Sequence, residues 1–432
     1  MAQNLAAALP GAGWQPTILS GSLSLPGRPG DARDFYRGLD VHTVDFTPAL
    51  EAPDPMRADP PFHPSYEDRE GAADVVFARL GDAAFEHQVR AWARALADAG
   101  AAAADVLHLH HLTPLNEAAA RVAPDVPVVG HLHGTELLML EAIEEGGAQW
   151  PHGAQWEARM RAWAARCERL IVLSDNQVHR AEGLLGIDGD RCVRVSNGFD
   201  PELFQPLPVD RAAHWRRHLV DEPQGWRPGE EAGSVGYGEE DLKAFAGGPT
   251  LLYVGRFTAV KRVGLLIEAY ALARLEFEHP APLVIVGGYP GEWEGEHPAD
   301  TIERTGAEGV FLAGWHGHDE LPGFLNASDV VVLPSVREQF GQVLVEGMAC
   351  GLPAIAVDAH GPGEIVSHGE TGWLVEPDDR DALAAALVEA VNRPVERRRR
   401  GAQAREVALE RYSWPALAQE VAAVYEAARA AA

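Results

Sequence analysis

The sequence predicts two α/β domains, each built around a parallel sheet. The chain has 432 residues, enough for two or three domains of ordinary size. In both halves, short runs of β-branched and apolar residues alternate with stretches of helical periodicity, which is the pattern of βαβ units. Between the halves, residues 202–249 are rich in Gly, Pro, Glu and Asp, and this composition predicts an acidic linker with an insertion.

Composition and charge argue against several classes of protein. The chain is 46% hydrophobic, which is ordinary for a globular protein, and no apolar run approaches the ~20 residues that span a bilayer. A formal net charge of −28 argues against a surface for nucleic acid or anionic membranes. The basic run 397–400 is expected to be a solvated helix face, with a lipid-headgroup contact as the alternative. Cys167, Cys192 and Cys350 are scattered, so a reducing cytoplasm is the expected setting.

The first half is predicted to form one domain, residues 1–205. Helices are expected over 3–9 and 85–97, and the proline-rich, acidic stretch 47–65 is expected to be an irregular loop. The sequence predicts strands over 16–19, 40–46, 106–111, 126–134, 170–173 and 193–195. Asp188-Gly189-Asp190 falls between two of them, where Asp and Gly are typical of a turn, so we interpret it as a turn and not as a metal site.

The second half is predicted to repeat this architecture over residues 250–412, after a linker at 206–249. Strands are expected over 251–254, 283–288, 310–314, 330–333, 354–357 and 373–375, and further helices over 383–391 and 402–409, with a last helix at 413–432. In parallel sheets of this kind, ligands bind at the carboxyl ends of the strands. The loops that follow the strands are therefore the places to look for function.

One such loop and helix carry two glutamates. Glu338 lies between a strand and a helix, and Glu346 lies about two turns inside that apolar helix, where a carboxylate needs a partner. The backbone N–H groups of Gly341, Gln342 and Val343 form a positive helix end that can hold an anion. Hydroxyl acceptors on either side of an anion cradle suit a nucleotide sugar. The alternative is an ordinary crossover helix with one hydrogen-bonded glutamate.

A second loop carries cations. Gly255-Arg256 and Lys261 follow the first strand of the second domain, where positive side chains are well placed for a diphosphate. An Arg and a Lys in solvent at a helix start are the alternative interpretation.

The wider context resembles the retaining glycosyltransferases of family 4 (group 1 type), which have the GT-B fold. The resemblance rests on Glu338, seven residues and Glu346, followed by GPGEIV and GETGWLVEP. It implies two Rossmann-like, doubly wound domains facing across a cleft, with the second binding a nucleotide sugar and the last helix packing back on the first, acceptor-side domain. The implied donor is a UDP-sugar and no metal or other cofactor is implied.

The resemblance also implies roles for individual residues. Glu338 would hold the hydroxyls of the donor sugar and Glu346 the ribose, while Arg256 and Lys261 would bind the diphosphate and take part in catalysis with Glu338. The remaining implied donor contacts are Gly255, Trp315, Phe340, Gly341, Gln342 and Val343.

Histidines end two strands of the first domain. His108 and His110 share one strand face, as do His131 and His133. A metal site, hydrogen-bonded strand ends and substrate contact are the three interpretations. His133-Gly134-Thr135 resembles the family segment that reaches the donor sugar and the acceptor, so His133 is a catalytic candidate, with His110, Gly134 and Thr135 on the acceptor side.

The first domain departs from the family pattern. Its opening resembles the family's first helix and second strand, so the first strand and its glycine-rich loop are expected to be lacking, through truncation or replacement. This departure leaves two alternatives to a metal-independent retaining transferase. One is a non-catalytic nucleotide-sugar-binding relic, and the other is a GT-B epimerase that converts the nucleotide sugar without an acceptor.

Overall fold

A computed structural model describes residues 2–24, 30–67, 73–146, 150–338 and 340–431 of the chain. The chain divides into two compact units, one of residues 1–196 with 417–432, the other of residues 197–416. Each unit has its own hydrophobic core. Both contain parallel sheets, as the alternating pattern predicts. Among the described residues, none of the helices is both long and apolar enough to cross a bilayer.

The second unit is built on a 6-stranded parallel sheet, in the order β12-β11-β10-β7-β8-β9. The strands are β7 (Leu251–Val254), β8 (Leu283–Val286), β9 (Val310–Gly314), β10 (Val330–Leu333), β11 (Ala354–Val357) and β12 (Gly372–Val375). Most are short runs of β-branched or aliphatic residues, buried because helices cover both faces of the sheet. All six lie where the sequence predicts strands.

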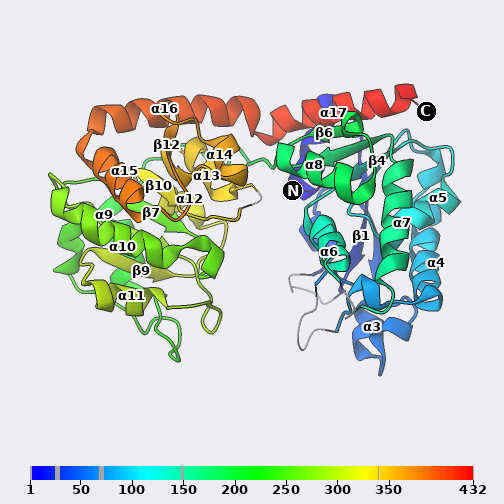
Figure 1. Ribbon diagram of the computed structural model, residues 1–432, viewed down its shortest axis with the longest axis horizontal. Helices are drawn as coiled ribbons and strands as arrows, with labels where there is room; N and C mark the ends of the chain where they lie inside the picture. Colours follow the sequence, from blue (N-terminus) through cyan, green and yellow to red (C-terminus); the bar gives the residue numbers. More distant parts are fainter. Residues whose placement is uncertain (1, 25–29, 68–72, 147–149, 339, 432) are drawn as a thin grey trace. The chain divides into compact units, whose positions relative to one another are not determined.

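Helices α10 (Val263–Ala273) and α15 (Arg380–Asn392) pack together, as do α13 (Gln342–Ala349) and α16 (Pro394–Arg411) (Figure 1). The unit's other helices are α9 (Arg211–Arg216), α11 (Pro298–Thr305), α12 (Leu321–Asn326) and α14 (His360–Ile365). The chain ends in α17 (Trp414–Ala431), whose residues from Leu417 onward belong to the first unit.

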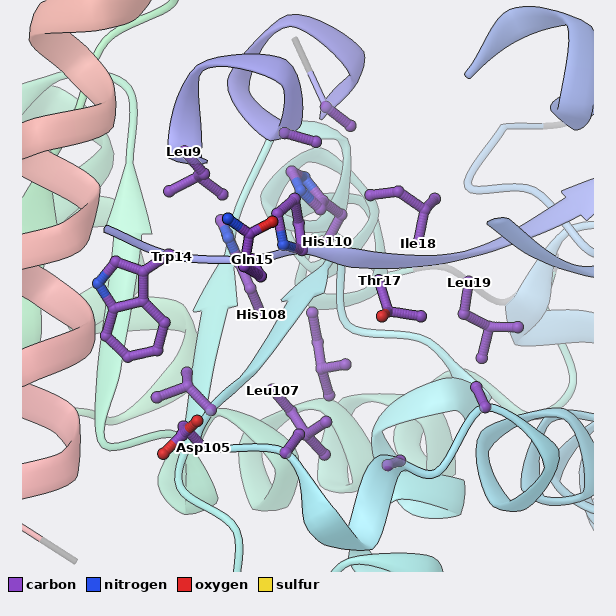
Figure 2. A pocket seen from close by; sticks show the side chains of 18 of the residues that line it. Leu9, Trp14, Gln15, Thr17, Ile18, Leu19, Asp105, Leu107, His108 and His110 are labelled. Carbon is purple, nitrogen blue, oxygen red and sulfur yellow. The ribbon is translucent and has the colours of Figure 1, made fainter. Parts of the chain in front are cut away.

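The first unit contains two separate parallel sheets. One pairs β1 (Thr17–Ser22) with β2 (Asp40–Asp45), and the other has the order β3-β4-β5-β6. Those strands are β3 (Leu107–His110), β4 (Val128–His131), β5 (Arg169–Val172) and β6 (Cys192–Arg194). A cavity of about 490 Å³ lies between β1 and β3. Figure 2 shows side chains of both strands lining it.

The helices of the first unit follow the predicted alternation with the strands. They are α1 (Ala2–Ala8), α2 (Ala32–Phe35), α3 (Thr47–Glu51), α4 (Asp82–Asp98), α5 (Pro114–Val122), α6 (Thr135–Glu144), α7 (Gly153–Arg166) and α8 (Asp175–Leu185). The stretch 47–65 is not wholly irregular, because α3 and a 3-10 turn at Pro55–Arg57 occupy part of it. Pro48 is suited to the first turn of α3, because an N–H group at that position would have no partner within the helix.

Residues 206–249, expected to be an acidic linker, instead belong to the second unit. They contribute α9 and a π-helical turn, Arg217–Asp221. Trp215, Leu219 and Trp226 lie in the core of the unit, and the Trp226 indole donates to the Gly288 carbonyl at 3.0 Å. Further apolar side chains of the segment, among them Tyr237 and Phe245, pack against the same core. Average composition hides these few large apolar residues in a polar background.

The basic run 397–400 is only in part the solvated helix face that we expected, because Arg398 and Arg399 are exposed and the other two arginines are not. Arg397 and Arg400 are buried. Arg397 donates to the carbonyls of Ala390 and Val391, and the Arg400 guanidinium lies 4.1 Å from the centre of the Trp373 ring and donates to the Gly372 carbonyl. Arg400 also pairs with Glu389 and Glu396, at 3.1 and 2.8 Å. Carbonyls thus compensate the burial of Arg397, while two carboxylates, a carbonyl and an aromatic ring compensate that of Arg400.

Replacing Trp215 tests whether the segment 206–249 is part of the core. Trp215→Ala is expected to lower the free energy of unfolding by ~3 to 5 kcal/mol, because it removes a buried indole and leaves a cavity. Leu207→Ala, at an exposed position of the same segment, is the matched control. Urea denaturation measures both variants, and a Trp215→Ala loss no larger than the control's would show that the segment is only a linker.

Candidate functional site

The candidate site lies where the sheet of the second unit reverses its strand order. β7 and β10 are adjacent, and from them the chain runs outward in opposite directions through β8 and β11. Loops that follow such a pair of strands enclose a crevice in which α/β proteins bind ligands. Here the two loops are tied together, because the Val336 N–H and the Ser335 hydroxyl both donate to the Val260 carbonyl, at 3.0 and 3.2 Å.

The predicted diphosphate lysine and sugar-binding glutamate form an ion pair. The Nζ of Lys261 contacts Oε2 of Glu338, and these side chains are only 18% and 20% exposed. Arg256 is different, because it is exposed and its guanidinium makes neither a hydrogen bond nor an ion pair with the described part of the chain. Three cations therefore lie in this loop: Lys261 and Arg262 are already partnered, Arg262 by Asp378, and Arg256 is available to an anion.

A cavity of about 470 Å³ opens beside Arg256. Gly255, Arg256 and Trp315, all predicted donor contacts, line it together with Gly287 and Tyr289. Trp315 and Tyr289 are 55% and 57% exposed, and their ring centres lie 6.3 Å apart. Exposed aromatic rings on a cavity wall are suited to stacking against a planar ligand. We did not predict a ligand contact for Tyr289, although this residue directly follows the predicted strand 283–288.

Glycines bring backbone segments close together in the loops that carry Arg256 and Glu338. Gly287 has a φ of +123°, and a Cβ atom there would lie 2.1 Å from the Gly255 carbonyl oxygen. A Cβ atom on Gly361 would lie 2.4 Å from the Phe340 carbonyl oxygen, and the Gly361 N–H donates to the Glu338 carbonyl at 3.2 Å. Both approaches require a residue without a side chain. They fix the loops that carry Arg256 and Glu338.

Helix α13 begins directly after Gly341, whose φ of +104° is a left-handed conformation that favours glycine. No side chain caps this end. The first N–H groups of the helix, on Gln342 and Val343, therefore form the positive end that the sequence predicts. The ring of Phe340, just before the helix, is buried against Tyr412.

Glu346 is 2% exposed and has the partner that its burial requires. Its Oε1 accepts from Nε2 of His318 at 2.8 Å and from the side-chain amide of Gln342 at 3.0 Å, and Gln342 also donates to the Gly198 carbonyl. The hydrogen bond with Glu346 raises the pKa of His318 above its usual value. His318 lies 28 residues away in the chain, so no local pattern connects it to Glu346.

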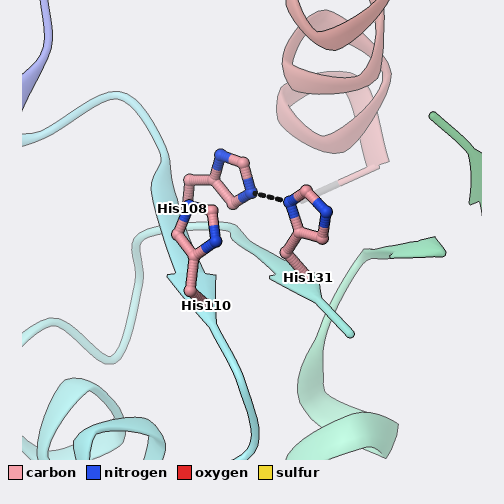
Figure 3. A group of neighbouring side chains, drawn as sticks. All are labelled: His108, His110 and His131. Atoms are coloured by element: carbon pink, nitrogen blue, oxygen red, sulfur yellow. Dashed lines mark hydrogen bonds between the residues drawn. The ribbon is translucent and has the colours of Figure 1, made fainter. Parts of the chain in front are cut away.

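In the first unit, histidines at the ends of β3 and β4 hydrogen-bond one another. Nε2 of His108 lies 3.1 Å from Nδ1 of His131 (Figure 3). Nδ1 of His110 lies 2.9 Å from Nε2 of His133. The Tyr425 hydroxyl, on α17, holds Nδ1 of His108 at 2.7 Å. The hydrogen-bonded interpretation of these histidines is thus confirmed. His108, His110 and His131 also offer nitrogen atoms within 4.8 Å of one another.

Glu136 anchors the segment that contains His133, Gly134 and Thr135. Its buried carboxylate accepts from the His133 N–H at 3.2 Å and pairs with Nδ1 of His111. Gly134, with a φ of +96°, makes the turn into α6. Burial and the nearby His111 lower the pKa of His133 to about 3, so its ring is neutral at neutral pH. Glu136 stands in the sequence motif, but we did not predict its anchoring role.

The Asp188-Gly189-Asp190 segment behaves as a turn. The Asp188 side chain accepts from the Asp190 N–H at 3.0 Å and begins a 3-10 turn at Gly189–Arg191. This is the local role that the sequence predicts for it.

The histidine group predicts that the protein loses stability in acid. Burial lowers the pKa values of His108, His110, His131 and His133 below 6.5, to about 3 for His108 and His133. Below pH ~6.5 the unfolded chain therefore binds protons that the folded chain does not, and stability falls with pH. Between pH 6 and 4 each such histidine should cost up to ~1.4 kcal/mol per pH unit.

Urea denaturation across this pH range measures the effect. His133→Asn should reduce the slope of the unfolding free energy against pH. Tyr425→Phe is the matched control, because it removes a hydroxyl beside His108 and keeps all four imidazoles. Equal slopes in wild type and His133→Asn would contradict the prediction.

Comparison with known proteins places the chain in a family. The model of Glycosyltransferase Family 4 matches residues 1–203, and the model of Glycosyl transferases group 1 matches residues 239–407. The D-inositol 3-phosphate glycosyltransferase of Kineococcus radiotolerans is 30% identical over 318 residues, which cover 70% of this chain and 67% of that protein.

Two solved structures share the fold. Sucrose-phosphate synthase from Thermosynechococcus elongatus matches with a TM-score of 0.65 at 21% identity, over 100% of this chain and 93% of that one. HepE of Anabaena, in complex with UDP and glucose, matches with a TM-score of 0.63 at 18% identity, over 98% and 95% of the two chains. These matches confirm the GT-B fold of two Rossmann-like domains that the sequence motifs predict. The chain belongs to the group 1 glycosyltransferases of family 4.

Proposed function

We propose that this glycosyltransferase moves a hexose from a UDP-sugar to an acceptor hydroxyl, with retention of configuration at the anomeric carbon and without a divalent metal. The observation that carries the proposal is the arrangement at the switch point of the second sheet. There the Lys261–Glu338 ion pair, the guanidinium of Arg256, which has no partner among the described residues, and the positive end of α13 follow adjacent strands.

The cations are assigned to the donor diphosphate. Arg256 has no other partner among the described residues, and a guanidinium forms charge-assisted hydrogen bonds to phosphate oxygens. The N–H groups of Gln342 and Val343 add donors that carry no side-chain entropy cost. Lys261 brings a second positive charge, while its partner Glu338 keeps acceptor capacity for sugar hydroxyls. Phosphate and sugar are thereby recognised by neighbouring groups.

The nucleoside is assigned to Glu346 and the aromatic cavity. Both hydrogen bonds to the Glu346 side chain use Oε1, so Oε2 is available to the ribose hydroxyls. Tyr289 and Trp315 offer ring faces for the base in the cavity beside Arg256. The choice of UDP is supported by HepE, which shares this fold and was solved with UDP and glucose.

The protein catalyses this transfer mainly by stabilising the leaving group. The bond between the anomeric carbon and the diphosphate oxygen breaks, the acceptor oxygen bonds to that carbon, and UDP departs with the acceptor proton. Negative charge grows on the diphosphate, where preorganised cations and N–H groups act most strongly. We assign the neutral ring of His133 to contact with the transferred sugar. Gly134, Thr135 and His110 are assigned to the acceptor side with it. Two cations near the diphosphate supply the charge that a metal ion supplies elsewhere.

Isothermal titration and a transfer assay test the function. We expect UDP to bind and one UDP-sugar to give transfer to an added acceptor, with the product retaining the donor's anomeric configuration and with full turnover in EDTA. Binding without transfer or hydrolysis would identify a non-catalytic binding protein, and conversion of the nucleotide sugar without an acceptor would identify an epimerase. Loss of turnover in EDTA, restored by magnesium, would contradict metal independence.

Single substitutions test the assigned roles. Arg256→Ala and Lys261→Ala should each lower turnover by roughly tenfold to a few hundredfold, because a charge-assisted hydrogen bond contributes ~1.5 to 3 kcal/mol to the stability of the charged leaving group. Glu346→Gln should mainly weaken UDP binding, because it removes the charge of a ribose acceptor. Melting temperature, UDP affinity and turnover separate folding from function. Arg380→Ala, on the exposed start of α15, is the matched control for loss of a cation. If Arg256→Ala kept the turnover of the wild type, the assignment of the diphosphate to this loop would be wrong.

A further inference from the structure

The segment 206–249 has no part in the donor site, yet it places a histidine beside two other potential metal ligands. His218 lies on the π-helical turn Arg217–Asp221, His316 follows β9, and Glu320 precedes α12. One ligand atom of each residue lies within 4.8 Å of the others. Single π-helical turns occur frequently at functional sites. The three side chains come from separate parts of the chain and meet only in the folded second unit.

The hydrogen bonds of His316 leave one ring nitrogen facing a carboxylate. Its Nε2 lies 3.2 Å from the Ala313 carbonyl oxygen, which only accepts, so this nitrogen carries a proton. Its Nδ1 lies 3.2 Å from Oε2 of Glu320. In the neutral ring, the lone pair of Nδ1 therefore faces a carboxylate oxygen. Such an arrangement is favourable only when a cation, either a proton or a metal ion, lies between the two atoms.

His218 provides a buried ligand without another function. It is 6% exposed, and its ring nitrogens make no hydrogen bond within the described residues. Its imidazole nitrogens are therefore available to an ion.

The geometry points to a zinc-class transition-metal site formed by His218, His316 and Glu320, and we propose that it binds one divalent ion. Two imidazoles and one carboxylate, with a fourth position open to water, are a common zinc ligand set. Bonds of about 2.0 to 2.1 Å place tetrahedral ligand atoms about 3.3 Å apart, close to the 3.2 Å between Nδ1 of His316 and Oε2 of Glu320. The backbone carbonyl of Ala313 would orient His316 from behind, as outer partners of metal-bound histidines do.

The histidine group of the first unit is the competing location. His108, His110 and His131 offer only neutral imidazoles. The ring planes of His108 and His131 are nearly parallel, with an interplanar angle of 3°, and the two rings are hydrogen-bonded to each other. That triad contains no carboxylate, so its three neutral ligands compensate less of the charge of a divalent cation. The second-unit site has the carboxylate, and Glu320 is 40% exposed, which gives an ion access from solvent.

The consequence of metal binding would be local. An ion held by these ligands ties residues 206–249 to the loop between β9 and α12, which also carries Trp315 and His318. The inference is independent of the proposed sugar transfer. It assigns the ion no step in transfer and is compatible with turnover in EDTA.

Isothermal titration of the metal-free protein with Zn²⁺, together with the visible absorption of a Co²⁺ complex, tests the site. We expect one tight ion for each chain and an absorption typical of tetrahedral cobalt. Glu320→Gln and His218→Gln should each weaken binding at least tenfold, since changes even in the outer partners of metal ligands cost roughly 10- to 100-fold. His108→Gln is the matched control and should bind as the wild type does.

The outcomes are distinct. Loss of tight binding in His108→Gln, with Glu320→Gln unaffected, would place the metal in the first unit and overturn the proposal. Absence of a tight site in the wild type would overturn it too, and would show that a proton lies between His316 and Glu320. Glu320 is exposed, so its substitution should leave folding intact even if His218→Gln is unstable. Melting temperature in the absence of metal checks this.

Discussion

The adjacency of β7 and β10 is the constraint that organises the candidate site of the second unit. Because these strands are neighbours in the sheet while 75 residues separate Ser335 from Val260, the loops that follow them come into contact. Hydrogen bonds to the Val260 carbonyl and the Lys261–Glu338 ion pair then hold the loops together. The ion pair is partly buried, so removing one partner would leave a charge poorly solvated. Its geometry keeps a cation and a hydroxyl acceptor side by side.

The buried Glu346 shows how the same region compensates the cost of burying a charge. Its carboxylate lies within an apolar helix and has no cation within that helix. His318 comes from the loop after β9, and Gln342 is one turn earlier on α13. A neutral amide and a histidine with a raised pKa together satisfy one oxygen. The other oxygen keeps its acceptor capacity, which is the property that a ribose contact needs.

The first unit uses histidines in a different way. Its buried imidazoles are neutral and hydrogen-bond one another, so they add no charge to the segment of His133 and Gly134. The carboxylate of Glu136 fixes the backbone of that segment through the His133 N–H and pairs with His111. Charge compensation is thus local, and the His133 ring is left to interact as a neutral group.

The sequence by itself determined the fold class, the strands of both units and the candidate residues at the switch point of the second sheet, because these depend on short patterns. Apolar strands such as Val330–Leu333 and the glutamate spacing on one helix are local properties. Tertiary structure alone decided the partners. The Lys261–Glu338 pair, the His318 contact to Glu346, the burial of Arg397 and Arg400, and the docking of 206–249 all join distant parts of the chain. Composition misassigned that last segment because two tryptophans and a few other large apolar residues outweigh many acidic residues once the apolar side chains are buried. Only the folded core determines whether they are buried.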